Sequence, residues 1–63
     1  MIIHATYDNI EVLLNTKYII DIWEIDKPIV DAFVLSENGI NKYQIEQKEL
    51  QKWISWENKN TNL

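Results

Sequence analysis

The segment YIIDIWEI, from Tyr18 to Ile25, has the composition of a β-strand but lacks the usual alternation of apolar and polar side chains. Alternate positions form two sets, the first with Tyr18, Ile20 and Ile22, the second with Ile19, Asp21, Trp23 and Ile25. Both faces of the strand are therefore apolar, and one also carries a carboxylate. A chain of 63 residues has little material with which to cover a second apolar face. The segment thus predicts a sheet whose second face needs a covering partner.

Turn signals around this segment divide the chain into strands. Asn38-Gly39 is a strong hairpin signal, because a type I′ turn needs positive φ at both central residues. A short turn at Asp8-Asn9 and loops at 15–17 and 26–28 complete the set. With these loops, the apolar side chains share one face of a five-strand antiparallel meander, curved or barrel-like. The predicted pairs on that face are Tyr7–Ile10, Ala5–Val12, Ile3–Leu14, Leu14–Tyr18, Val12–Ile20, Ile10–Ile22, Ile22–Ala32, Ile20–Val34, Val34–Tyr43 and Ala32–Ile45.

The apolar period changes after the last strand. Leu50, Trp53 and Ile54 fall at i, i+3 and i+4, which predicts a short amphipathic helix from about Gln47 to Trp56, packed on the common face. One longer helix from Asn41 to Trp56 is the alternative. We expect one compact domain over residues 1–57 and a flexible polar tail over residues 58–63.

The same registers predict the composition of the second face. They place Ile19 opposite Leu35, Asp21 opposite Phe33, Trp23 opposite Asp31 and Ile25 opposite Ile29. Exposed aromatic residues ringed by polar groups are typical of protein interfaces. The candidate partner-binding residues are Ile19, Asp21, Trp23, Asp31, Phe33 and Leu35. In the alternative interpretation, the sheet curls strongly and Trp23 and Phe33 pack locally.

Composition argues against catalytic and cofactor chemistry. The chain has no cysteine, and His4 is its single histidine, so neither a disulfide nor a classical zinc site is expected. No nucleophile motif or glycine-rich phosphate loop occurs. We therefore expect no catalytic residues, no metal and no cofactor, and classify the chain as a non-enzyme. Tyr7, Tyr18 and Tyr43 fall on the helix-covered face, where we expect them in the core.

The net charge of the chain favours a protein partner over nucleic acid. Ten acidic residues against six lysines and no arginine give a net charge of −4, which disfavours nucleic acid. Neither a signal peptide nor a membrane-spanning segment is visible, so a cytoplasmic location is expected. Small size, acidity and abundant Ile, Asn and Lys fit a protein encoded by a phage or another mobile element. The sequence predicts a small regulator or inhibitor that binds a protein partner. The alternatives are a small-barrel nucleic-acid binder using Lys17, Lys27 and Lys42, and a homo-oligomer such as a dimer.

Overall fold

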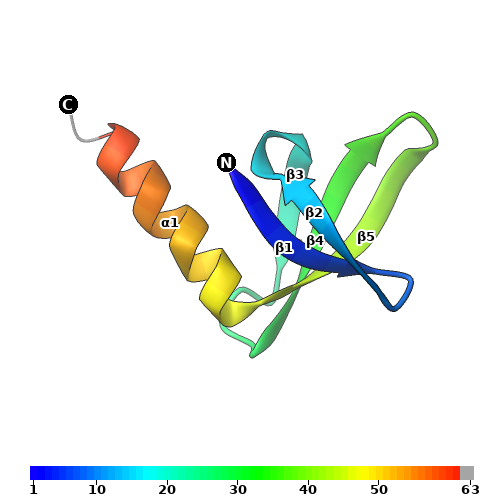
Figure 1. The fold of residues 1–63 in the computed structure, drawn as a ribbon, viewed down its shortest axis with the longest axis horizontal. Coiled ribbons are helices and arrows are strands. Elements are labelled where there is room, and N and C mark those ends of the chain that lie inside the picture. Colours follow the sequence, from blue (N-terminus) through cyan, green and yellow to red (C-terminus); the bar gives the residue numbers. More distant parts are fainter. Residues whose placement is uncertain (62–63) are drawn as a thin grey trace.

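The chain forms a five-strand antiparallel sheet followed by one C-terminal helix, which confirms the predicted fold class (Figure 1). A computed structural model describes residues 1–61. The elements are β1 (Ile2–Tyr7), β2 (Ile10–Asn15), the 3-10 turn η1 (Thr16–Tyr18), β3 (Ile19–Trp23), β4 (Ile29–Ser36), β5 (Gly39–Glu46) and α1 (Gln47–Thr61).

The order of the strands differs from the predicted meander. The sheet runs β2-β1-β5-β4-β3, so β2 and β3 lie at opposite edges and do not pair. The predicted pairs Leu14–Tyr18, Val12–Ile20 and Ile10–Ile22 are therefore wrong. β1 pairs instead with β5, at Thr6 and Gln44. Because the two edges are not joined, the sheet is not closed into a barrel.

The strand order differs because residues 15–17, predicted to form a hairpin loop, do not turn the chain back onto β2. Thr16–Tyr18 form η1, and the side chain of Asn15 caps it by accepting a hydrogen bond from the Lys17 N–H at 3.1 Å. Thr16 is buried, and its N–H donates to the carbonyl of Met1 at 2.9 Å. The chain thus leaves β2 beside the start of β1 and continues to the far edge of the sheet. The alternation of apolar residues cannot decide whether β2 pairs with β3 or β1 pairs with β5. Both arrangements place the same side chains on the same face of the sheet.

The first hairpin has the predicted register, with Tyr7 opposite Ile10 and continuous pairing beyond it. Its turn residues, Asp8 and Asn9, have φ of 52° and 65°. Positive φ at both positions is the signature of the type I′ turn, which Asp and Asn tolerate better than other non-glycine residues.

The β4–β5 hairpin is shifted by two residues from the predicted register. Ala32 pairs with Tyr43 and Val30 with Ile45, because the turn residues are Glu37 and Asn38 and Gly39 pairs with Ser36. Gly39 has φ of 104°, whereas Glu37 and Asn38 are not in the positive-φ region. These φ values fit a type I turn with a positive-φ glycine directly after it, and the pairing beside the turn is continuous. A shift of two residues leaves each side chain on its predicted face.

The β3–β4 pair contains an irregularity. Ile22 lies opposite Ala32, as predicted, but a bulge between Ile19 and Asp21 places Ile19, not Ile20, opposite Val34. β3 ends at Trp23, so the predicted pair Ile25–Ile29 does not form.

The core lies between one end of the sheet and the first turns of α1. Its buried apolar members are Ile3, Ala5, Leu14, Val30, Ala32, Val34, Ile45 and Leu50. The strand members all come from the face that the sequence analysis assigned to the core. Figure 1 shows α1 leaving that end of the sheet and projecting past the start of β1.

Because α1 covers only one end, the opposite end of the same face is open. Tyr7 stacks on Tyr43 at 4.7 Å between ring centroids, yet Tyr7 remains exposed, as does Tyr18 in η1. The expectation that all three tyrosines lie in the core is therefore wrong for Tyr7 and Tyr18.

The helix begins where predicted, and the alternative helix from Asn41 is wrong because β5 continues to Glu46. Gln47 secures the junction: its N–H donates to the carbonyl of Pro28 at 3.0 Å, and its side chain donates to the carbonyls of Ile25 and Lys27. The helix extends to Thr61, beyond the predicted end at Trp56. A flexible tail over residues 58–63 stays a prediction, and its last two residues lie outside the described part of the chain.

Candidate protein-binding face

The face of the sheet away from α1 carries a group of large apolar side chains, which we call the aromatic patch: Trp23, Phe33, Leu35 and Ile40. Trp23 comes from β3, Phe33 and Leu35 from β4, and Ile40 from β5, directly opposite Leu35. The exposed fractions are 57% for Trp23, 54% for Leu35 and 60% for Ile40, while Phe33 is half-buried beneath them. The antiparallel pairing therefore gathers four apolar side chains on one surface.

Trp23 is exposed but held in place. Its ring centroid lies 5.0 Å from that of Phe33 with the planes tilted by 55°, a favourable aromatic geometry. Its Nε1–H donates to Oδ2 of Asp21 at 2.7 Å. The other carboxylate oxygen of Asp21 accepts from the N–H of Ile22 at 2.9 Å. Both oxygens are therefore engaged in positioning the aromatic ring and the strand.

The carboxylate of Asp21 is accommodated on this apolar face because it stays in contact with water. Asp21 is exposed, so its charge keeps contact with water and carries no large desolvation penalty. Asp31, opposite Trp23 on β4, is half-buried. Lys42 lies opposite Phe33. Two carboxylates and one ammonium group thus border the aromatic patch.

The structure brings together five of the six predicted residues. Ile19 is the exception: the bulge in β3 places it opposite the buried Val34, and its side chain packs against the core. Ile40 was missed, because the predicted turn register set it opposite Glu37 instead of Leu35. The signal that would have found it is the single glycine, which can follow a type I turn as well as form part of a type I′ turn.

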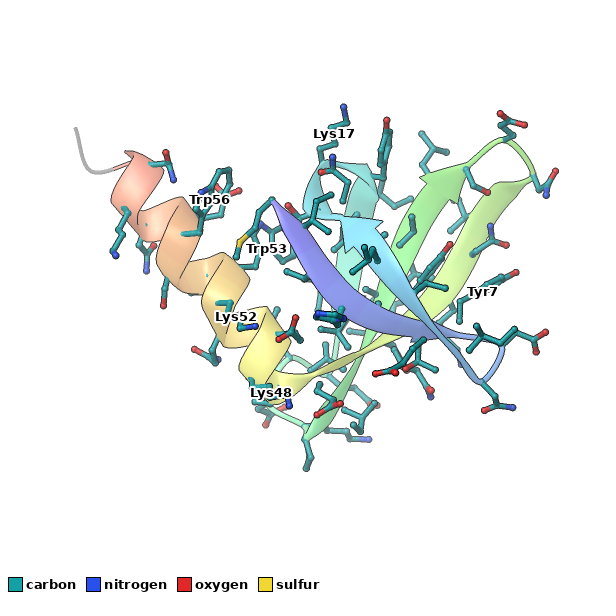
Figure 2. The ribbon with its side chains drawn as sticks, in the orientation of Figure 1. Tyr7, Lys17, Lys48, Lys52, Trp53 and Trp56 are labelled. Atoms are coloured by element: carbon teal, nitrogen blue, oxygen red, sulfur yellow. The ribbon has the colours of Figure 1, made fainter. Side chains whose placement is uncertain are left out.

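The lysines of the nucleic-acid alternative come from three separate elements, and Lys27 is ion-paired with Glu24. This pair raises the pKa of Lys27. Figure 2 shows Lys48 and Lys52 on α1, apart from Lys17 in η1. Lys48 and Lys52 are paired with Glu46 and Glu49, respectively.

His4 is exposed on β1, and its neighbours Thr6 and Glu11 lie on the same face of the first hairpin. Within residues 1–61, no three acidic, histidine or cysteine side chains are grouped to hold a metal ion. Among the described helices, none has the length and apolar character to cross a membrane. No protein-family model, curated protein or solved structure matches the chain.

Proposed function

We propose that this chain is a non-enzymatic protein-binding module, a small cytoplasmic regulator or inhibitor that docks its aromatic patch on another protein. The observation that carries the proposal is Trp23, which is 57% exposed yet fixed by the Asp21 carboxylate and the Phe33 ring. Tryptophan is among the residues that contribute most to binding at interfaces.

The fixed side chain favours binding because less conformational entropy is lost when a partner covers it. Immobilising a flexible side chain on association costs about 0.5–1.5 kcal/mol. The hydrogen bond and the ring contact order Trp23 in the free protein. Leu35 and Ile40 extend the apolar surface beside it.

The flanking charges specify the chemistry of the partner. Asp21 and Asp31 border the aromatic patch near Trp23, so a complementary surface presents an apolar pocket with basic residues at its rim. Charges at a rim mainly accelerate association and exclude wrong partners. Binding is therefore expected to weaken and slow as salt rises.

The test is affinity capture from a lysate of the source organism, followed by measurement of binding to the isolated partner. Trp23→Ala and Leu35→Ala should weaken that binding at least tenfold while circular dichroism stays unchanged. Trp56→Ala is the matched control, because Trp56 is 41% exposed but lies on α1, away from the aromatic patch. A partner that binds Trp23→Ala as tightly as the wild type, and loses affinity for Trp56→Ala, would refute the proposal.

A further inference from the structure

The two edge strands of the sheet, β2 and β3, differ in whether their outward backbone N–H and C=O groups are blocked or open to another chain. β3 is interrupted by its bulge, and the carboxylate of Asp21 occupies the N–H of Ile22. Bulges and edge charges are devices that prevent a sheet from pairing with another chain. β2 has no bulge, since its six residues, IEVLLN, pair with β1 in unbroken register, and Glu11 is its one charge, with no lysine, proline or glycine. β2 is thus the unprotected edge.

The register of the first hairpin shows which groups on β2 are free. In a two-residue hairpin the residues flanking the turn, here Tyr7 and Ile10, exchange hydrogen bonds, and bonded pairs then alternate along the ladder. The bonded residues of β2 are therefore Ile10, Val12 and Leu14. The N–H and C=O groups of Glu11 and Leu13 and the N–H of Asn15 point away from β1, whereas the C=O of Asn15 accepts the first hydrogen bond of η1.

Two observed hydrogen bonds agree with this assignment. The Thr16 N–H donates to the carbonyl of Met1 at 2.9 Å, which continues the set of bonded even-numbered residues. On β1, the N–H of His4 points away from β2 and donates to the carboxylate of Glu49 at 2.8 Å. The free N–H of His4 is thus satisfied by a side chain, whereas no side chain within residues 1–61 occupies the free backbone groups of β2.

The side chains on this edge are also apolar. Leu13 is 69% exposed and Ile10 is 63% exposed, the two highest values among the large apolar residues described. They lie on opposite faces of the sheet, because their positions differ by an odd number. Glu11 is the single charged residue of β2.

We propose that β2 pairs with β2 of a second copy of this chain, antiparallel, about a two-fold axis through Leu13. A strand edge is complementary to itself, since each free N–H meets a free C=O when the second strand runs in the opposite direction. The inference does not rest on the proposed function, because the aromatic patch is built from β3, β4 and β5.

The free groups restrict the register. Hydrogen-bonded pairs must join Glu11, Leu13 and Asn15 of one copy to the same three residues of the other. A register that sets Glu11 opposite Glu11 brings like charges together, which is destabilising. With Leu13 on the axis, Glu11 lies opposite Asn15 of the second copy, and all three residues of each strand take part. This register forms about four backbone hydrogen bonds, because Asn15 contributes its N–H alone, and it covers both copies of Leu13.

The experiment measures mass in solution by analytical ultracentrifugation from micromolar to millimolar concentration, with amide exchange followed by NMR in the same samples. We expect a monomer–dimer equilibrium, with the amides of Glu11, Leu13 and Asn15 becoming protected as the dimer forms. Leu13→Pro removes a free N–H that no intrachain bond uses, and Leu13→Lys places a charge on the axis. Each variant should raise the dimer dissociation constant by roughly tenfold or more. Ile20→Lys is the control, since Ile20 is 52% exposed on the other edge strand.

Three outcomes would overturn the proposal. The first is a monomer at every concentration, with fast exchange at those three amides. The second is a dimer that persists in Leu13→Lys, the variant that keeps the backbone donor and folds even if the proline variant does not. The third is a dimer that Trp23→Ala dissociates while Leu13→Lys does not, which would place the contact on the aromatic patch. Loss of dimerisation leaves partner capture by Trp23 unaffected, so failure of this inference is distinct from failure of the proposed function.

Discussion

The carboxylate of Glu49, in the first turn of α1, accepts a hydrogen bond from the backbone N–H of His4 in β1 at 2.8 Å. β1 pairs with β5 at Thr6 and Gln44, and the pairing does not continue to His4, which would face Glu46 at the end of β5. Glu49 is only 4% exposed, and Lys52 pairs with it at 2.7 Å. A single side chain therefore completes the edge of β1, joins the helix to the sheet and places negative charge near the helix N-terminus, where it is favourable.

Replacing Glu49 should destabilise the fold through the unpaired His4 N–H. We expect Glu49→Ala to lower the urea midpoint of unfolding more than Glu49→Gln, since the amide oxygen of glutamine can still accept the bond. Glu46→Ala is the control, because Glu46 is exposed and its contact with Lys48 is long, at 3.7 Å. Equal midpoints for the variants at positions 46 and 49 would contradict this role.

Stability should fall in acid because of the same carboxylate. The Lys52 ammonium and the His4 N–H lower the pKa of Glu49 below its ordinary value. A lowered pKa in the folded state means that the stabilisation is complete above the unfolded-state pKa of about 4.3 and is lost as pH falls through the folded-state pKa.

Urea unfolding from pH 7 down to acidic pH measures this effect. Glu49→Gln should flatten the acidic part of the profile, whereas Glu46→Ala should leave it unchanged. A profile for Glu49→Gln with the wild-type slope would assign the acid sensitivity to other carboxylates.

Truncation of Leu50 should reveal the core that α1 completes. Leu50 is fully buried among strand residues, so Leu50→Ala should cost about 2–5 kcal/mol of unfolding free energy. Leu35→Ala makes the same chemical change at a side chain that is 54% exposed, and its effect should be within about 0.5 kcal/mol. Denaturant titration of both variants checks the difference, and similar losses would mean that α1 contributes little to the core.

Removing a glycine from one hairpin turn and adding one to the other should change the stability of the fold in different directions. A Cβ added at Gly39 has no atom within 4 Å, so Gly39→Ala causes no steric clash. Its cost is the strain of an alanine backbone at φ of 104°, about 1–2 kcal/mol of unfolding free energy. Asn9→Gly, at φ of 65° in the type I′ turn, should be neutral or slightly stabilising. Thermal unfolding compares the two, and a destabilised Asn9→Gly would show that the asparagine side chain has a further role.

Local sequence signals correctly predicted the fold class and placed five of the six candidate binding residues on one face of the sheet. The alternation of apolar residues identified Ile3, Ala5 and Leu14 as one core face, and the change of period identified Leu50 on the helix. Trp23 and Phe33 were placed together because their strands share a short loop whose register held from Asp21 to Trp23.

Two local features defeated the prediction of the remaining residues. The bulge in β3 moved Ile19 to the core, and the turn at Glu37-Asn38, in place of the predicted Asn38-Gly39, brought Ile40 opposite Leu35. A bulge adds one residue to one strand without altering its composition, so the sequence contains no strong signal of it.

By itself the sequence determined which segments form strands, where the helix begins and, outside the bulge in β3, which side chains share a face, because these follow from periods of two and 3.6 residues and from turn chemistry. Only the tertiary structure decided which strands are neighbours. The buried Thr16 and the start of β1 direct the chain from β2 to the far edge, and this contact joins residues whose proximity no local pattern encodes. That choice left β2 as an open edge and brought the carboxylate of Glu49 to His4, because backbone groups without a strand partner must find one elsewhere.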